Sequence, residues 1–148
     1  MKIIKISNFR NQLGEGVWWD DNNKLLHWTD ILEGKLYSFN PKTQKETYKK
    51  FDGKLGCFAP CKNGSFLIGL NLSFYIYNPS SQELSKFVDL NDEPQENRIN
   101  DGTTDPKGRF WFGTMTSEGH AKKQNGSIYC IYPNKKVKKF FIESILHT

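Results

Sequence analysis

Short apolar and aromatic runs alternate with polar positions along the whole chain, and glycine, asparagine, proline or aspartate bounds most of them. No window sustains the i, i+3, i+4, i+7 apolar spacing of an amphipathic helix. Alternation with a period of two, interrupted by turn residues, is typical of strands in a sheet. The pattern therefore predicts an all-β chain.

The strand-like segments recur with a period of about 40 residues. Comparable apolar segments begin at Lys24, Ser65 and Arg109, and a stretch of small and polar residues precedes each of them. An aromatic strand that ends in a turn follows each segment, and a more polar strand comes next. Four short strands per repeat of this length are the signature of a β-propeller blade. The predicted blades cover residues 13–52, 53–90 and 97–142.

Composition and charge narrow the classes of protein that the chain can belong to. Of the 148 residues, 36% are hydrophobic and 14% aromatic, which suffices for a packed core. No run approaches the roughly 18 apolar residues that span a bilayer, and Lys5 interrupts the opening apolar segment. The net charge of +5 comes without a basic helix or a recognised nucleic-acid-binding signature. We therefore predict a cytoplasmic protein that binds neither nucleic acid nor membrane.

Cysteine, histidine and tryptophan have structural interpretations. The three cysteines form no disulfide framework, and Cys57-x-x-x-Cys61 would need two more ligands at matching spacing to hold zinc. We predict reduced, partly buried thiols. His27 lies inside an apolar strand and is expected to be a core residue, as are the four tryptophans.

One polar cluster stands out as candidate chemistry. Arg98, Asn100 and Asp101 lie within four residues of each other and are followed by Gly102. Arginine only donates hydrogen bonds, aspartate only accepts them and asparagine does both, so the cluster suits a hydroxyl-rich or carbonyl ligand. In an extended segment Arg98 and Asn100 would share one face and Asp101 would take the other. The alternative interpretation is an ordinary turn, because Asn, Asp and Gly are turn residues.

Several motifs occur in order along the chain: Leu13-Gly14-Glu15-Gly16, Leu26-His27-Trp28-Thr29-Asp30-Ile31, Arg98-Ile99-Asn100-Asp101-Gly102, Asp105-Pro106, Gly108-Arg109 and Gly113-Thr114-Met115. Together they resemble the senescence-marker-protein, gluconolactonase and luciferin-regenerating-enzyme family, also called regucalcin-like. The similarity runs from about Leu13 to the last residue. It implies a ring of six blades from a chain about twice this length, so that only the N-terminal half is present. Residues 2–7 would then be the strand that closes the ring.

The resemblance assigns a role to five residues. It makes Glu15 a metal ligand, and it makes Arg98, Asn100 and Glu118 substrate-binding residues. Asp101 would lie beside them as a catalytic residue that orients a metal-bound water. The implied cofactor is a divalent metal ion, which could be calcium, zinc, magnesium or manganese. From the residues alone, Glu15 is also interpretable as an exposed turn residue and Glu118 as part of a solvated loop.

The implied function is metal-dependent hydrolysis of a small sugar lactone such as glucono-1,5-lactone. The family's other two metal ligands would lie in the absent half, so we expect little activity from this chain by itself. An open half-ring would expose blade faces and edges, which predicts self-association. The alternatives are a non-catalytic propeller-type binding module and a truncated, inactive remnant.

Overall fold

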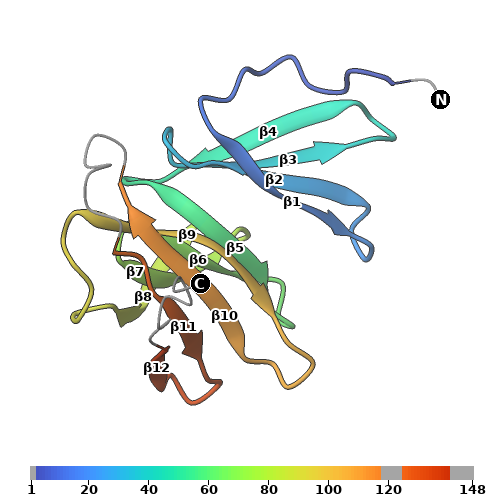
Figure 1. Cartoon of the computed structure of the whole chain (residues 1–148). Helices are drawn as coiled ribbons and strands as arrows, with labels where there is room; N and C mark the ends of the chain where they lie inside the picture. Colours follow the sequence, from blue (N-terminus) through green and yellow to red (C-terminus); the bar gives the residue numbers. More distant parts are fainter. Residues whose placement is uncertain (1–2, 118–124, 141–148) are drawn as a thin grey trace. The chain divides into compact units, whose positions relative to one another are not determined.

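The computed structural model of the chain describes residues 3–117 and 125–140 (Figure 1). These residues form twelve β-strands and no helix, so they contain no helix long and apolar enough to cross a membrane. The chain divides into two compact units, residues 1–55 and 56–148. The all-β prediction is confirmed.

The first unit is one four-stranded antiparallel sheet in which the strands lie side by side in chain order (Figure 1). Each connection is a short hairpin, so every strand pairs with its neighbour in sequence. This is the topology expected for one blade. The strands are β1 (Gly14–Asp20), β2 (Leu25–Asp30), β3 (Lys35–Asn40) and β4 (Lys45–Lys50).

The second unit repeats this arrangement twice. Two more four-stranded sheets have the orders β5-β6-β7-β8 and β9-β10-β11-β12, again in chain order. Their strands are β5 (Leu55–Pro60), β6 (Phe66–Leu70), β7 (Ser73–Asn78), β8 (Glu83–Asp89), β9 (Asn97–Thr104), β10 (Phe110–Thr116), β11 (Ile128–Ile131) and β12 (Val137–Phe140). Each sheet therefore corresponds to one of the three predicted repeats.

The hairpins share a local turn chemistry that the sequence encodes. At the end of β3, Asn40 Oδ1 accepts hydrogen bonds from the backbone N–H groups of Lys42 and Thr43, and Asn78 does the same at the end of β7. Such Asx turns are a standard use of asparagine. The turns close with a left-handed residue at Gln44 (φ 56°) and Gln82 (φ 61°). Short side chains that cap their own turn thus set where one strand ends and the next begins.

Aromatic side chains build the core of the second unit. The ring of Phe74 on β7 is fully buried, and its centroid lies 4.6 Å from that of Phe112 on β10. Phe112 in turn stacks on Tyr129 of β11, with centroids 5.2 Å apart. Edge-to-face and offset pairs of this kind are worth about 0.5–1.5 kcal/mol each beyond the area they bury. The two sheets of this unit therefore share one hydrophobic core, to which Ile99 of β9 also belongs.

A second aromatic group covers one face of the first sheet. Trp28 and Tyr37 are cross-strand partners on β2 and β3, and their rings stack in parallel with centroids 5.0 Å apart. Phe9, from the segment before β1, lies 5.3 Å from the Tyr37 ring. Residues 3–7 form no strand here, and residue 2 lies outside the described residues. The ring-closing role of residues 2–7 stays a prediction.

The cysteines are free thiols as expected, but only one of the four tryptophans is buried, since Trp18 and Trp111 are half-buried and Trp19 is exposed. Cys57 and Cys130 are buried, Cys61 is half-buried, and all three are free thiols. Trp28 is buried as predicted, whereas the side chain of Trp19 is 43% exposed. Trp19 and Trp18 are adjacent on β1 and must point to opposite faces of the strand, so a single sheet cannot bury both equally.

His27 is a buried core residue, as predicted, with an exposed fraction of 3%. The Ser38 hydroxyl on β3 lies 2.9 Å from His27 Nδ1, and the Trp18 ring stacks on the imidazole. Burial lowers the pKa of His27, although a backbone hydrogen bond at Tyr37 and the charge of Asp20 oppose this. The native chain therefore holds the neutral imidazole near neutral pH.

This burial predicts acid sensitivity of the first unit. As pH falls below the usual histidine value near 6.5, the unfolded chain binds a proton that the folded chain resists. We expect stability to drop by at most about 1.4 kcal/mol per pH unit between pH 6.5 and the lowered pKa. Urea unfolding followed by tryptophan fluorescence at pH 7 and pH 5 measures it, with His27→Asn as the reference. Parallel stability curves for the two proteins would contradict the prediction.

Candidate functional site

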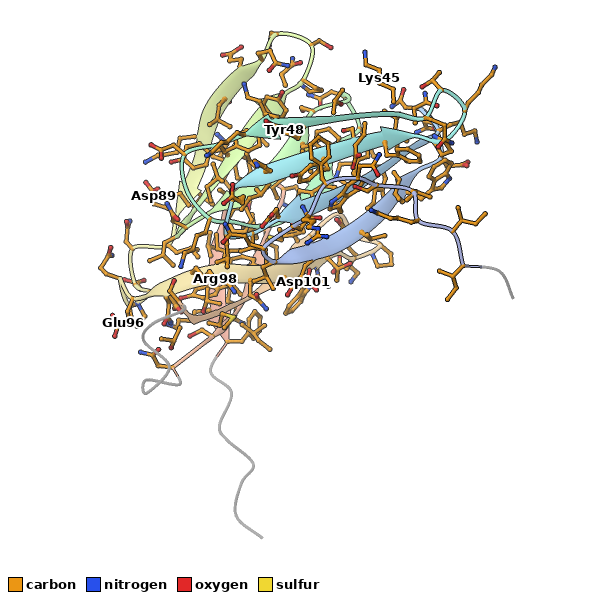
Figure 2. The ribbon with its side chains drawn as sticks, turned by 90° about the horizontal axis from the view of Figure 1, so that it is seen from above. Lys45, Tyr48, Asp89, Glu96, Arg98 and Asp101 are labelled. Carbon is orange, nitrogen blue, oxygen red and sulfur yellow. The ribbon has the colours of Figure 1, made fainter. Side chains whose placement is uncertain are left out.

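The candidate recognition residues lie at a β-bulge in β9, the first strand of its sheet. Ile99 pairs with Thr114 and Gly102 pairs with Phe112, so Asn100 and Asp101 together face the single residue between those partners. A bulge bends the strand and redirects its side chains, and bulges are frequent beside active sites. Figure 2 shows Glu96, Arg98 and Asp101 following one another along this segment.

The structure brings Arg98 and Asn100 together, on one side as predicted. Arg98 Nη1 donates to Asn100 Oδ1 at 2.7 Å and to the carbonyl oxygen of Ile99 at 3.2 Å. Arg98 is only 3% exposed, Asn100 is half-buried and Asp101 is exposed. Asp101 Oδ1 accepts a hydrogen bond from the backbone N–H of Gly102 at 2.7 Å. The guanidinium is thus buried and bonded to the half-buried Asn100, while the neighbouring Asp101 is exposed to solvent.

Two glycines allow the close packing around this bulge. A Cβ atom on Gly56 of β5 would lie 2.1 Å from the carbonyl oxygen of Ile99. A Cβ atom on Gly102 would lie 2.6 Å from the Phe110 ring. Both distances are far inside van der Waals contact, so only glycine fits without a shift of the neighbours. The backbone of β9 therefore packs directly against β5, and this contact fixes the position of the bulge.

Glu15, the predicted metal ligand, also lies at a bulge in the first strand of its sheet. The register of β1 against β2 shifts between Glu15 and Trp18, and Gly16 has a φ of 64°. The side chain of Glu15 is exposed, and its carbonyl oxygen accepts a hydrogen bond from the Thr29 hydroxyl at 3.2 Å. Glu15 belongs to the first unit and the Arg98 cluster to the second, and the role of Glu15 as a metal ligand stays a prediction.

The donor chemistry of Glu15 suits a hard divalent cation, but the number of ligands does not. Calcium takes six to eight oxygen ligands, and zinc usually takes four ligands. Within residues 3–117 and 125–140, no group of three or more His, Cys, Asp or Glu side chains could hold a metal ion.

Glu118, the remaining predicted substrate contact, lies outside the described residues. Its role stays a prediction.

The turn between β9 and β10 is held by Asp105. Its carboxylate accepts hydrogen bonds from Arg109 Nε at 2.6 Å, from Trp111 Nε1 at 3.1 Å and from two backbone N–H groups. Partial burial alone would raise the pKa of Asp105, but the hydrogen bonds from Trp111 and Arg109 outweigh it and lower the pKa to about 2. Asp105 is therefore ionised at neutral pH. It stabilises the turn that follows β9, at the C-terminal end of this strand.

Sequence reasoning missed Glu93, which lies between β8 and β9 and is only 3% exposed. Its carboxylate accepts hydrogen bonds from Asn97, Thr114, Tyr129 and Lys139. Burial by itself raises the pKa of Glu93, but these four donors outweigh it and hold the pKa below its usual range. In the sequence Glu93 lies in a polar run before a proline, which looks like an exposed connection.

Three four-stranded sheets in chain order, two of them with polar side chains at a bulge in the first strand, are typical of a propeller-type protein. The chain belongs to the SMP-30/Gluconolactonase/LRE-like region family, whose model matches residues 13–146. This confirms the resemblance on which the fold and site were predicted.

Relatives of known sequence and structure agree with this assignment. The chain is 29% identical to regucalcin of Xenopus laevis over 144 residues, which cover 95% of this chain and 48% of regucalcin. It is 32% identical to the 6-deoxy-6-sulfogluconolactonase of Pseudomonas putida over 103 residues, covering 70% of this chain and 35% of that enzyme. The crystal structure of a calcium-binding protein, regucalcin, from Agrobacterium tumefaciens matches with a TM-score of 0.83 and 26% identity, covering 92% of this chain and 45% of that one.

The comparisons bear on fold and length. The predicted β-propeller class is confirmed, since the matched structure is that of a regucalcin and each of the three sheets has blade topology. The chain spans about half the length of the regucalcins it matches, and about a third of the Pseudomonas lactonase.

Proposed function

We propose that the polar cluster at the β9 bulge is the substrate-binding part of a sugar-lactone hydrolase of the gluconolactonase type. The observation that carries the proposal is the Arg98–Asn100 hydrogen bond at a bulge, in a chain of this family. The Pseudomonas relative, which acts on a gluconolactone by its name, supports the class of substrate. The reaction adds water to the lactone carbonyl carbon and breaks the ring C–O bond, giving the open aldonic acid.

Each residue of the cluster has a part in this proposal. Because Asn100 Oδ1 accepts from Arg98, its Nδ2 group is left to donate to a sugar hydroxyl. Arg98 supplies positive charge below that contact, which strengthens hydrogen bonds to the ligand. Asp101 is exposed beside them and is the candidate acceptor that orients the attacking water. Glu118 is retained as a further contact to the sugar.

The proposed reaction also uses a divalent metal ion. Glu15 would supply one carboxylate to a divalent ion, and the regucalcin relative described as calcium-binding supports calcium among the four candidate metals. When bound, such an ion polarises a carbonyl group and lowers the pKa of water. Within the described residues no three His, Cys, Asp or Glu side chains come together, so in this proposal Glu15 acts with ligands that are still to be identified. A cytoplasmic location stays a prediction.

Hydrolysis of glucono-1,5-lactone tests the proposal directly. The purified chain is stripped with EDTA, supplied with calcium, zinc, magnesium or manganese in turn, and assayed by pH-stat against the spontaneous rate. Light scattering on the same samples reports whether the open blades have self-associated. In an active sample, Asn100→Ala is expected to lower kcat/KM by roughly tenfold to a hundredfold, because it removes a hydrogen bond to the substrate.

The matched control is Asn91→Ala, an exposed asparagine in the turn after β8. It should leave kcat/KM unchanged. Equal effects of the two substitutions would overturn the role of Asn100. No rate above the spontaneous one with any metal, in any oligomeric state, would overturn lactonase activity for this chain.

A second candidate function is ligand binding without turnover. The specific observation in its favour is that the residues described in the structure supply Glu15 but no metal-binding group of three. Titration calorimetry with D-gluconate, in EDTA, separates the two candidates. Binding that Asn100→Ala abolishes, in a chain without lactonase activity, would support the binding module.

A further inference from the structure

The network around Glu93 is an unusual feature of the second unit. The carboxylate is buried and takes one hydrogen-bond donor from each of the four strands of one sheet. Oε1 accepts from Asn97 Nδ2 at 2.7 Å and from the Thr114 hydroxyl. Oε2 accepts from the Tyr129 hydroxyl at 2.5 Å and from Lys139 Nζ at 3.0 Å. Both oxygens are therefore fully used, as a buried carboxylate requires.

Two of these contacts fall on either side of Arg98. Asn97 immediately precedes Arg98, and its carboxamide is held through Nδ2 by Glu93 and by the carbonyl oxygen of Asn125. Thr114 is the cross-strand partner of Ile99, which immediately follows Arg98 and accepts from its guanidinium. Glu93 Oε1 thus holds both flanks of Arg98 through β9 and β10.

The contacts of Tyr129 and Lys139 fix the position of the Glu93 carboxylate. Tyr129 stacks on Phe112 of the core, so the hydroxyl that meets Glu93 is fixed by ring packing. Lys139 also donates to the carbonyl oxygen of Asp92 at 3.3 Å, which fastens the loop that carries Glu93 to the outermost strand. Side chains locked by packing and by satisfied hydrogen bonds are what keep a binding residue in place.

We propose that Glu93 is a positioning residue, which sets the start of β9 and thereby holds the Arg98 guanidinium in its buried place under Asn100. The functional importance of this position rests on the proposed function, in which Arg98 is a substrate-binding residue. Its physical content, the coupling of Glu93 to Arg98, is independent of any substrate.

A carboxylate is required because all four contacts are donors. Glutamine is nearly isosteric with glutamate but carries an NH2 group in place of one oxygen. Whichever oxygen it replaces, two of the four donors lose their acceptor. Glu93→Gln should therefore loosen the flanks of Arg98 while it preserves the volume of the side chain.

The accessibility of Arg98 to phenylglyoxal, which modifies arginine, reports its position in the full chain without any ligand. Modification at each arginine is followed by peptide mass spectrometry over time. In the wild type Arg98 is buried and should react slowly, while exposed Arg10 serves as the internal standard. In Glu93→Gln we expect Arg98 to react roughly tenfold faster, equivalent to about 1.4 kcal/mol in the opening equilibrium.

Asp105→Asn is the matched control, because Asp105 also holds the third sheet through hydrogen bonds, at the opposite end of β9. It should raise the reactivity of its own partner, Arg109, and leave Arg98 protected. Glu93→Gln should instead raise the reactivity of Arg98 and leave that of Arg109 unchanged. A general loosening of the sheet would instead raise the reactivity of Arg98 equally in both variants, and that result would overturn the proposal.

A second variant decides the matter where Glu93→Gln does not fold. Tyr129→Phe removes one donor to Glu93 but keeps the ring stacked on Phe112, and should expose Arg98 in the same direction by a smaller factor. Rapid modification of Arg98 in the wild type, or unchanged protection in the folded variants, would overturn the positioning role. Lactonase activity is a separate readout, so failure of the proposed function and failure of this coupling are distinguishable.

Discussion

Replacing Gly56 with alanine is expected to destabilise the second unit by about 3 kcal/mol. The added Cβ would lie 2.1 Å from the carbonyl oxygen of Ile99 and 2.9 Å from that of Asn100. Both are backbone atoms of β9 at the bulge, so the clash cannot be relieved by rotating a side chain. Either β5 or β9 must shift, and the shared core of the two sheets loses contacts.

Urea unfolding followed by circular dichroism measures this loss. Gly113→Ala is the control, since the nearest atom to its added Cβ lies 4.0 Å away. An alanine that fits should change stability by no more than about 1 kcal/mol, and can raise it by restricting the unfolded chain. Similar unfolding midpoints for the two variants would show that β5 and β9 are not packed as closely as described.

Replacing Glu93 with alanine is expected to cost about 3 kcal/mol, because buried hydrogen-bond donors of the sheet lose their acceptor and the half-buried Lys139 loses its ion-pair partner. The variant leaves the Lys139 ammonium beside an empty space and removes the acceptor of three other side chains. Glu83→Ala, at an exposed position at the start of β8, should stay within about 0.5 kcal/mol of the wild type.

The loss of stability in Glu93→Ala should also depend on pH. The lowered pKa of Glu93 means that its stabilising contribution is complete above the unfolded value near 4.5 and is lost as pH falls through the lower folded value. Lys139 stays protonated throughout this range, and burial with the Glu93 hydrogen bond raises the pKa of Tyr129 to about 12. The stability gap between the wild type and Glu93→Ala should therefore narrow in acid. A gap that does not change with pH would contradict an ionised Glu93.

Features that a local pattern determines were predictable from the sequence. The apolar segments that were expected to begin at Lys24, Ser65 and Arg109 form β2, β6 and β10, each of which begins one residue later. Turn residues and period-two alternation are properties of neighbouring residues, so the sequence alone reveals them. The approach of Arg98 to Asn100 followed from the same alternation. The repeat of about 40 residues then gave the number of sheets without any knowledge of their contacts.

Features that depend on distant residues were not predictable. Neither bulge is visible in the sequence, since the register of β9 depends on its pairing with β10. Glu93 looked solvated because its four partners are spread over the following 46 residues. Whether residues 2–7 pair with another strand likewise depends on contacts beyond their own segment, and residues 3–7 form no strand here.

The spread of the Glu93 partners also bears on how the third sheet folds. Each hairpin of this protein joins strands that are neighbours in sequence, so its loop closes at little entropic cost. The contact from Glu93 to Lys139 instead spans 46 residues and cannot form until β12 has joined the sheet. Until then the carboxylate lacks a donor and stays hydrated, because an unpaired charge is too costly to bury. The fourth strand of this sheet, β12, is thus needed to complete the hydrogen bonds of the carboxylate that precedes its first strand, β9.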